Sequence, residues 1–433
     1  MKVSSAVSLA ICLMLAVSSA AAAAETAGQV RLTITETPIA KVHTGSLLAR
    51  ISGPVRLVAS PDNRHEAHPV ARSFGKGMVL ALDGQAYSPK LAGFGDATIT
   101  WSPDSKRLAF VAGAPQKGSR RSVILDGVEQ KQYDEVAMPL VFSPDSKRFA
   151  YLAKQGKRWL AVVDGVEMRD YEGGIGPIAF DAAGKRFAYS ASAENKWFIV
   201  TDGQEGERYD LAFGPTFSPD GTRLAYSAKS GDNCFAIING ERQQQYDDVG
   251  APVAFSPDSK HVAYIAGKGD RKFVVLDGVE GTAYELIQDL TYSPDGSRLA
   301  YRASRDKKIM LVVVDGTEGA RYDSVDWLTF SPDGKRFAYV AKLGDKRFLV
   351  VDGVAQAREG AIAPAFSPDS KRLAYLALSG GKIAVVVDGV ATKQYEGVFY
   401  GTRLVWDSPD RLHTLLRTGQ DREATIVEVQ ITE

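Results

Sequence analysis

Four residues of this chain combine charge and aromatic character where matching segments of the same chain are apolar. Arg302 stands where five other segments carry an aliphatic residue, and Asp289 stands where three segments carry proline. The aliphatic residues are Val111, Leu152, Ile265, Val340 and Leu376, and the prolines are Pro139, Pro177 and Pro252. Asp326 and Trp327 open the following segment in the same irregular way.

These residue types allow two interpretations. Arg302, Asp289, Asp326 and Trp327 could line a small polar pocket in which the Arg302 guanidinium clamps an anion. Alternatively, Arg302 and Asp289 form an ion pair that fills a defect in the core. We predict these four residues as a ligand or partner site and keep the ion pair as the alternative.

The histidines give little support for catalysis. His65 and His68 in "RHEAHP" are separated by two residues and lack the His-Glu-x-x-His spacing of zinc proteases, so a loop is the simpler interpretation and a weak metal site the alternative. His261 takes the place of an arginine that recurs in a turn. The sequence also contains no Gly-x-Ser-x-Gly motif and no phosphate-binding glycine loop. We expect no catalytic residue, no metal and no cofactor.

Composition and the first residues indicate an exported globular protein. The 433 residues include 52 basic and 52 acidic side chains, so no basic field favours nucleic acid as a partner. The first 24 residues have Lys2, an apolar stretch and a run of alanines, which together predict a signal peptide cleaved near Ala24. We therefore expect a periplasmic or secreted protein without a membrane span in the mature chain. Cys234 is then the one remaining cysteine, which excludes an internal disulfide.

A repeat of about forty residues organises the rest of the chain, from residue 54 to residue 433. Its first landmark is Ser-Pro-Asp, and its second is Asp-Gly or Asn-Gly about twenty residues later. The Ser-Pro-Asp aspartates are Asp62, Asp104, Asp145, Asp220, Asp258, Asp295, Asp333, Asp369 and Asp410, and a degenerate copy lies at Ala183. Both landmarks suit tight turns between strands, because Pro fixes one φ angle and Asp-Gly tolerates two positive ones.

Each repeat predicts four short strands, and runs such as "RFAYLA" are apolar on both faces. Sheets covered on both faces must stack on one another, which is typical of β-propeller blades. We therefore predict an all-β propeller of about ten four-stranded blades. The segment 25–53 contains a strand-like stretch, "QVRLTITETPI", that would complete the last blade and close one ring. Two smaller propellers that divide near residue 250 are the alternative.

The repeat "FSPDGKRFAYVA" followed by "FLVVDG" resembles the WD-like propeller repeat of TolB, the periplasmic protein of the Tol system. It is also similar to the propeller domains of prolyl-oligopeptidase-type and tricorn proteases. The resemblance covers nearly all of residues 54–433 and implies the fold. It does not imply an activity, because the shared residues form turns and core while those families do different things.

Loop residues supply the remaining functional hypothesis. The loops between the second and third strands are basic, and the connections between blades carry an acid after a recurrent tyrosine. These pairs begin at Tyr133, Tyr171, Tyr209, Tyr246, Tyr284, Tyr322 and Tyr395. They either form a charged platform for a partner, or the tyrosines pack between blades while the acids pair with Arg148-type residues.

From these features we predict an exported, monomeric and non-enzymatic scaffold that binds a protein or an envelope component through one face or the central channel. Two alternatives stay open. One is a propeller hydrolase or lyase that acts on a peptide or a glycan. The other is a passive structural module of an envelope assembly.

Overall fold

The computed structural model describes residues 30–41, 58–71, 78–87, 99–113, 118–356, 360–399, 401–419 and 423–432. The predicted signal peptide lies outside these residues. Every regular element within them is a strand, and none is a helix that could cross a membrane. The strands form ten antiparallel sheets, each built from strands that follow one another along the chain, except for one strand from the N-terminus. The prediction of an all-β propeller with ten blades is therefore confirmed.

Each sheet is one blade, numbered here from 1 to 10. Blades 1 to 5 contain, in order, β2 (Val58–Ala59), β3 (Glu66–Ala71), β4 (Met78–Leu82) and β5 (Gln85–Ala86); β6 (Thr100–Trp101), β7 (Leu108–Ala112), β8 (Arg121–Leu125) and β9 (Val128–Tyr133); β10 (Glu135–Phe142), β11 (Phe149–Gln155), β12 (Arg158–Val163) and β13 (Val166–Tyr171); β14 (Ala179–Phe180), β15 (Phe187–Ala193), β16 (Lys196–Thr201) and β17 (Gln204–Glu205); β18 (Leu211–Phe217), β19 (Leu224–Ser230), β20 (Asn233–Ile238) and β21 (Glu241–Arg242).

Blades 6 to 10 follow the same plan. They contain β22 (Asp248–Val249), β23 (Ala254–Phe255), β24 (Val262–Lys268), β25 (Arg271–Leu276) and β26 (Val279–Glu280); β27 (Leu286–Tyr292), β28 (Leu299–Ser304), β29 (Met310–Val314) and β30 (Thr317–Tyr322); β31 (Ser324–Phe330), β32 (Phe337–Leu343), β33 (Lys346–Val351) and β34 (Val354–Gln356); β35 (Ala361–Phe366), β36 (Leu373–Ser379), β37 (Lys382–Val387) and β38 (Val390–Ala391); β39 (Gly397–Val398), β40 (Val405–Ser408), β41 (Arg411–Thr418), β42 (Glu423–Thr432) and β1 (Arg31–Lys41).

The two repeated turns have the local chemistry that the sequence predicts. In blade 3, the Ser143 hydroxyl donates to Asp145 Oδ1 at 2.5 Å, and the Lys147 N–H donates to the same oxygen at 3.2 Å. The second turn places Asp164 at φ 52° and the following glycine at φ 80°. Two positive φ angles in succession are what a two-residue hairpin requires, and glycine adopts them without steric penalty. The recurrent aspartates therefore build turns.

The core lies between the blades rather than within one central sandwich. Ten clusters of buried apolar residues are present among the described residues, and each joins one blade to the next around the ring. The recurrent tyrosines contribute to several of them: the Tyr133 ring packs edge-on against Tyr151 of the following blade with 6.2 Å between centroids. Stacked sheets thus bury both of their faces, which explains why the strands are apolar on both faces.

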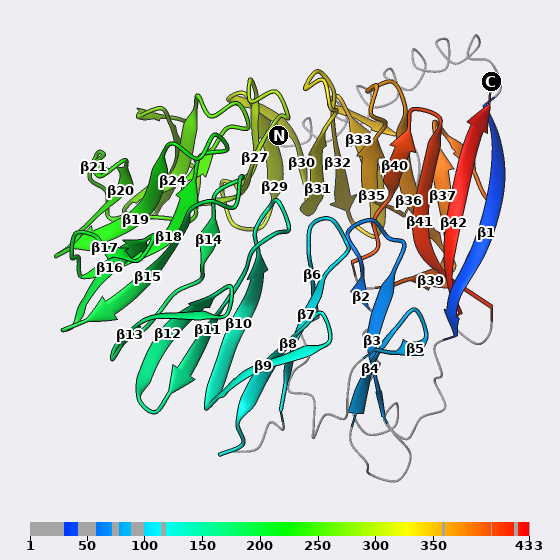
Figure 1. The fold of residues 1–433 in the computed structure, drawn as a ribbon. Coiled ribbons are helices and arrows are strands. Elements are labelled where there is room, and N and C mark those ends of the chain that lie inside the picture. Colours follow the sequence, from blue (N-terminus) through cyan, green and yellow to red (C-terminus); the bar gives the residue numbers. More distant parts are fainter. Residues whose placement is uncertain are drawn as a thin grey trace, which may run out of the picture.

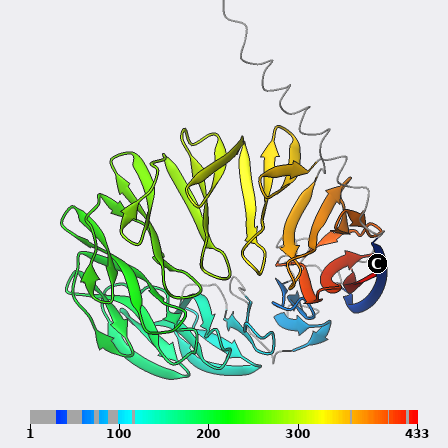
Figure 2. The same ribbon diagram turned by 90° about the horizontal axis from the view of Figure 1, so that it is seen from above.

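The ring closes through the N-terminal strand, as the sequence predicts. β1 pairs with β42 in antiparallel register from Arg31 opposite Thr432 to Lys41 opposite Glu423, and so becomes the outermost strand of blade 10. Ala59 of blade 1 then packs against Leu415 and Ile426 of blade 10. Figure 2 shows the blue N-terminal strands beside the red C-terminal ones, while Figure 1 shows β1 at the edge of the last blade.

A division near residue 250 is not present. Blades 5 and 6 share a buried cluster that contains Tyr246 and Tyr264, and the Arg223 guanidinium lies over the Phe255 ring of blade 6 at 4.8 Å. This junction is built like the others, so the alternative of two smaller propellers is wrong. Because the first strands of neighbouring blades contact one another, as β27 and β31 do, these strands form the inner wall of the ring.

Candidate functional site

The first strands of blades 7 and 8 are interrupted on the inner wall. In β27 the register against β28 shifts between Gln288 and Thr291, and β31 shifts against β32 between Asp326 and Thr329. The bulged residues are Asp289, with φ 55°, and Trp327, with φ 59°. A bulge re-aims the side chains that it carries, and a positive φ is strained for a bulky residue such as tryptophan.

Two other blades carry small residues at the corresponding bulge, whereas blade 3 carries Pro139 there. Gly214 of blade 5 has φ 67° and Ala363 of blade 9 has φ 52°, and each precedes a proline. Proline cannot donate to the ladder, so it suits the interrupted segment. Blades 7 and 8 keep the bulge but place an acid and an indole there, which the scaffold does not require.

Arg302 lies on β28 and bridges the two interrupted strands. It pairs with Gln288 in the sheet, and its guanidinium forms an ion pair through NH2 with Asp289 of its own blade. The NH1 group donates to the Val325 carbonyl of blade 8 at 2.7 Å and to Asp326 Oδ1 at 3.2 Å. The structure therefore brings Arg302, Asp289 and Asp326 together, with the interblade hydrogen bond to Val325 as a contact that the sequence does not reveal.

Burial differs sharply among the members of this cluster. The Arg302 side chain is 20% exposed, whereas those of Asp289 and Asp326 are 53% and 56% exposed. One partly buried guanidinium between two exposed carboxylates leaves a local formal charge of −1. The predicted anion clamp is therefore disfavoured, because the NH1 and NH2 groups already face carboxylates and a further anion would meet two negative charges. The predicted Arg302–Asp289 ion pair is present.

Trp327 supplies an apolar surface beside these carboxylates. It is 52% exposed although tryptophan is a residue that globular proteins usually bury. Exposed indoles next to polar groups are typical of residues that contribute strongly to protein–protein interfaces. The inner wall of blades 7 and 8 thus presents an exposed indole, together with two carboxylates that the partly buried Arg302 binds.

The tyrosine–acid pairs of the interblade connections have a structural role. Their tyrosines are buried between blades, as the second interpretation predicts. Their acids do not pair with Arg148-type residues, however. Asp134 Oδ2 accepts the Gly156 N–H at 2.6 Å, and Asp210 Oδ2 accepts the Gly231 N–H at 2.7 Å. Lys196 also binds Asp210 at 2.5 Å, and both interactions lower the pKa of that carboxyl group. These acids cap the hairpin loops of the next blade.

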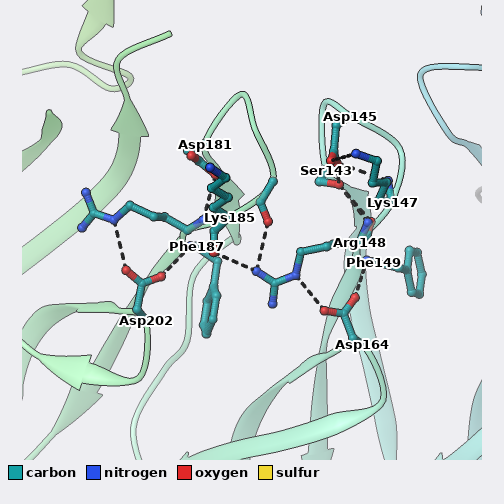
Figure 3. Close-up of polar contacts among 12 residues, drawn as sticks. Ser143, Asp145, Lys147, Arg148, Phe149, Asp164, Asp181, Lys185, Phe187 and Asp202 are labelled. Atoms are coloured by element: carbon teal, nitrogen blue, oxygen red, sulfur yellow. Dashed lines mark hydrogen bonds and ion pairs between the residues drawn. The ribbon is translucent and has the colours of Figure 1, made fainter. Parts of the chain in front are cut away.

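The Arg148-type residues instead join neighbouring blades on the opposite face, which carries the Ser-Pro-Asp and Asp-Gly turns. Arg148 Nε donates to Asp164 Oδ2 at 2.7 Å within blade 3 (Figure 3). Its NH1 group donates to the Gly184 and Lys185 carbonyls of blade 4 at 3.1 Å and 3.2 Å. The guanidinium also lies 5.3 Å from the centroid of the Phe180 ring of blade 4. We call this arrangement the arginine latch.

The histidines of blade 1 are each held by a carboxylate of the same blade. His65 Nδ1 lies 2.7 Å from Asp83 Oδ2, and His68 Nδ1 lies 2.7 Å from Glu66 Oε2. The two rings therefore face different partners, and no group of three or more potential metal ligands occurs among the described residues. His68 belongs to strand β3, so the loop that we predicted is wrong for this residue, whereas His65 lies in the turn that precedes β3. Both histidines have a structural contact with a carboxylate.

No family model and no curated protein matches the chain. Solved structures do match. The crystal structure of TolB from Acinetobacter baumannii is 14% identical with a TM-score of 0.27, and the match covers 74% of this chain and 81% of that one. A structure described as the eukaryotic initiation factor is 12% identical with a TM-score of 0.43, over 73% of this chain and 92% of that one.

A structure of the Dos1 propeller is 10% identical with a TM-score of 0.35, over 67% of this chain and 90% of that one. The propeller assignment rests on the ten sheets of this chain itself. Similarity at this level carries no argument about activity or partners.

Proposed function

We propose that this protein is an exported, non-catalytic propeller that binds another protein through the inner wall of blades 7 and 8. The observation that carries the proposal is the exposed indole of Trp327 beside the exposed carboxylates of Asp289 and Asp326. The repeat supplies Gly214 and Ala363 at this bulge, so the scaffold does not explain a tryptophan there. Export is supported by the apolar and alanine-rich first 24 residues.

The chemistry of this surface favours a partner segment with an apolar side chain and a basic residue. The indole offers a large rigid contact area at little loss of conformational entropy, and the two carboxylates attract lysine or arginine. The Arg302 guanidinium holds both carboxylates through its fixed planar geometry, so the surface is ordered before the partner arrives. The closed ring contributes in the same way, because blades 7 and 8 are each packed between two neighbouring blades.

Site-specific photocross-linking tests this proposal. A photoreactive amino acid replaces Trp327 in one variant and Val354 in a second, since Val354 belongs to the same blade, is 56% exposed and lies on its outermost strand. We expect a discrete cross-linked protein from position 327 in cells that express the chain, and none from position 354. Equal products from both positions, or no protein product from either, would contradict a protein site on the inner wall.

A substitution test needs a variant that removes the indole without straining the fold. Trp327→Gly repeats the residue that blade 5 uses at this bulge, and glycine relieves the positive φ. We expect loss of the cross-linked partner when the photoreactive residue is moved to an adjacent exposed position, while the unfolding midpoint stays equal to or above that of the unchanged protein. The N-terminus of the recovered protein, read by mass spectrometry, tests export: processing near Ala24 is expected, and an intact Met1 would contradict it.

A further inference from the structure

Blade 6 lacks the arginine of the latch. His261 stands in its place and keeps only the contact within the blade, with Nδ1 at 2.6 Å from Asp277 Oδ2. In other blades the arginine also donates to backbone carbonyls of the next turn. These contacts are Arg107 to Ser146 and Lys147, Arg148 to Gly184 and Lys185, Arg186 to Gly221, Arg223 to Ser259, Arg298 to Gly334 and Lys335, and Arg336 to Lys371.

The acceptors for such a guanidinium are nevertheless present in blade 7. The matching turn carbonyls belong to Gly296 and Ser297, and within the described part of the chain neither accepts a hydrogen bond from a side chain of blade 6. The matching aromatic ring is that of Tyr292, where other blades have phenylalanine under the arginine. An imidazole bound to Asp277 is too short to reach these groups, because a guanidinium carries its second nitrogen farther from the backbone.

A cavity of about 570 Å³ lies between blades 6 and 7 at this position. Its polar lining includes His261, Asp277, Tyr292, Gly296 and Ser297, and its apolar lining includes Val274, Leu276, Val279 and Leu299. Similar wedges of about 330 Å³ and 500 Å³ lie between blades 5 and 6 and between blades 7 and 8, and each is lined by the latch arginine of its first blade, Arg223 or Arg298. The cavity between blades 6 and 7 has His261 in place of that arginine, while Arg298 of blade 7 also lines it. The wedge is therefore part of the scaffold. Particular to blades 6 and 7 are the carbonyls that accept no hydrogen bond from a latch arginine of the preceding blade.

The charge around this cavity favours a cation. Asp277, Glu280 and Asp315 line it together with Arg298. Arg298 pairs with Asp315 at 2.7 Å and Lys268 pairs with Glu280 at 2.7 Å, so one negative formal charge remains at Asp277. The Tyr292 hydroxyl is buried and has no hydrogen-bond partner among the described residues. Burial raises the pKa of Tyr292, and the negative charges of Asp277 and Asp258 raise it further, which shows that the ring lies in a negative field.

We propose that this cavity binds a guanidinium group carried on a short aliphatic stem, that is, an arginine side chain. The planar cation stacks on the Tyr292 ring and donates to the Gly296 and Ser297 carbonyls, as the Arg148 guanidinium does with the matching groups of blade 4. The stem packs against Val274 and Leu276. The site lies on the face that carries the Ser-Pro-Asp and Asp-Gly turns. The proposal does not depend on the inner-wall function proposed above.

Blade 1 shows that a histidine alone does not create such a site. His65 also replaces the latch arginine, but the next blade places Trp101 there, and the two rings stack with 6.2 Å between centroids. The indole of Trp101 therefore covers the position that the guanidinium takes in other blades. His65→Arg is consequently a matched control for His261→Arg.

Calorimetric titration of the full mature protein tests the proposal, with acetyl-arginine amide as the probe and acetyl-lysine amide as the comparison. We expect the arginine amide to bind at least about tenfold more tightly than the lysine amide, because an ammonium cannot offer two planar N–H edges. The histidine ring signals in a ¹³C-resolved NMR spectrum should shift for His261 and not for His65. Equal affinities for both amides, or no binding of the arginine amide, would overturn the proposal.

Two variants test whether the probe binds in this cavity and whether the missing arginine creates the site. His261→Arg restores the residue of the other blades, so it should fold, fill the cavity and weaken binding at least about tenfold, whereas His65→Arg should leave binding unchanged. Unchanged affinity in His261→Arg would overturn the assignment. Free L-arginine distinguishes the two sources of the same group: binding equal to that of the amide indicates a small-molecule ligand, and binding of the amide alone indicates an arginine within a peptide. Both results support the guanidinium site.

Discussion

Replacing Arg148 by histidine should loosen the junction between blades 3 and 4 while leaving blade 3 itself intact. Histidine retains the carboxylate contact, as His261 does with Asp277 at 2.6 Å. It loses the hydrogen bonds to the Gly184 and Lys185 carbonyls, at 3.1 Å and 3.2 Å, and the cation–π contact with Phe180. The substitution thus separates the interblade part of the latch from the part within the blade.

The size of the effect follows from these three contacts. Each hydrogen bond from a charged but partly solvated donor contributes about 0.5–1 kcal/mol, and the cation–π contact contributes about 0.5 kcal/mol at a partly exposed site. The free energy of unfolding should therefore fall by about 2 kcal/mol. In a chain of 433 residues this shifts the melting temperature by only a few degrees, so a local measurement is more sensitive.

Hydrogen exchange followed by mass spectrometry supplies that local measurement. Peptides from β11, β12 and β15 should exchange up to about thirtyfold faster in Arg148→His, and peptides from blades 7 and 8 should be unchanged. Arg148→Lys, which keeps the charge but cannot span all three acceptors, should give an intermediate effect. Urea is the denaturant for the companion unfolding curves, because guanidinium would compete for the latch. Unchanged exchange at the blade 3–4 junction would refute the view that the latch joins neighbouring blades.

Three further predictions concern the turns and the closure. Gly184→Ala should destabilise the protein by about 2 kcal/mol, because glycine there has φ 66° and a Cβ would lie 2.5 Å from Asp145 Oδ1. Gly165→Asn meets open space and should cost less than about 1 kcal/mol. Urea midpoints of the two variants that agree within error would contradict this prediction. Leu32→Lys should weaken β1 pairing and expose the β42 edge, giving self-association by analytical ultracentrifugation where the unchanged protein stays monomeric; a monomer with an unchanged melt would argue against closure by β1. Hydrogen bonds from Ser256 and the Lys260 N–H lower the pKa of Asp258 from 3.8 to about 2, and the pKa values of the matching aspartates in other blades shift in the same direction. The contribution of these carboxylates to stability is therefore complete above about pH 4 and disappears as the pH falls towards 2. A urea midpoint that stays constant between about pH 4 and pH 2 would contradict this prediction.

The sequence was sufficient for the fold because the repeat states the same local information ten times. Each Ser-Pro-Asp and Asp-Gly turn is determined by residues within a few positions of each other, and the strands between them are apolar on both faces. The closing role of β1 was also predictable, since the last repeat has one strand too few. The choice between one ring and two depended on the junction of blades 5 and 6, which involves side chains far apart in sequence.

The candidate site was predictable only in its membership. Internal comparison of the repeats identified Arg302, Asp289, Asp326 and Trp327 as departures from the scaffold, and the structure places the first three in contact. The sequence comparison did not reveal that Arg302 binds the Val325 carbonyl across the interblade junction, nor that both carboxylates are more exposed than the arginine. Of the two interpretations, the Arg302–Asp289 ion pair is present, and the two carboxylates argue against an anion as the ligand.

The same limit applies to His261 and to the acids that follow the recurrent tyrosines. The sequence placed His261 correctly in the position of the latch arginine, but the consequence depends on acceptors in the next blade. The joint change of arginine to His261 and phenylalanine to Tyr292 was the available signal. Asp134 was expected to meet an arginine and instead caps the Gly156 N–H, because loop positions across two blades cannot be read from spacing alone.

The most direct test of the inner-wall function is hydroxyl-radical footprinting of the tagged protein, isolated with its partner and compared with the same preparation after dissociation. This measurement surveys both faces of the ring without choosing a site beforehand. We expect protection of Trp327 and of neighbouring residues of β27 and β31, with Val166 and Val354 equally reactive in both states. Protection confined to Val166, Val354 and the turn face, with Trp327 unchanged, would contradict it.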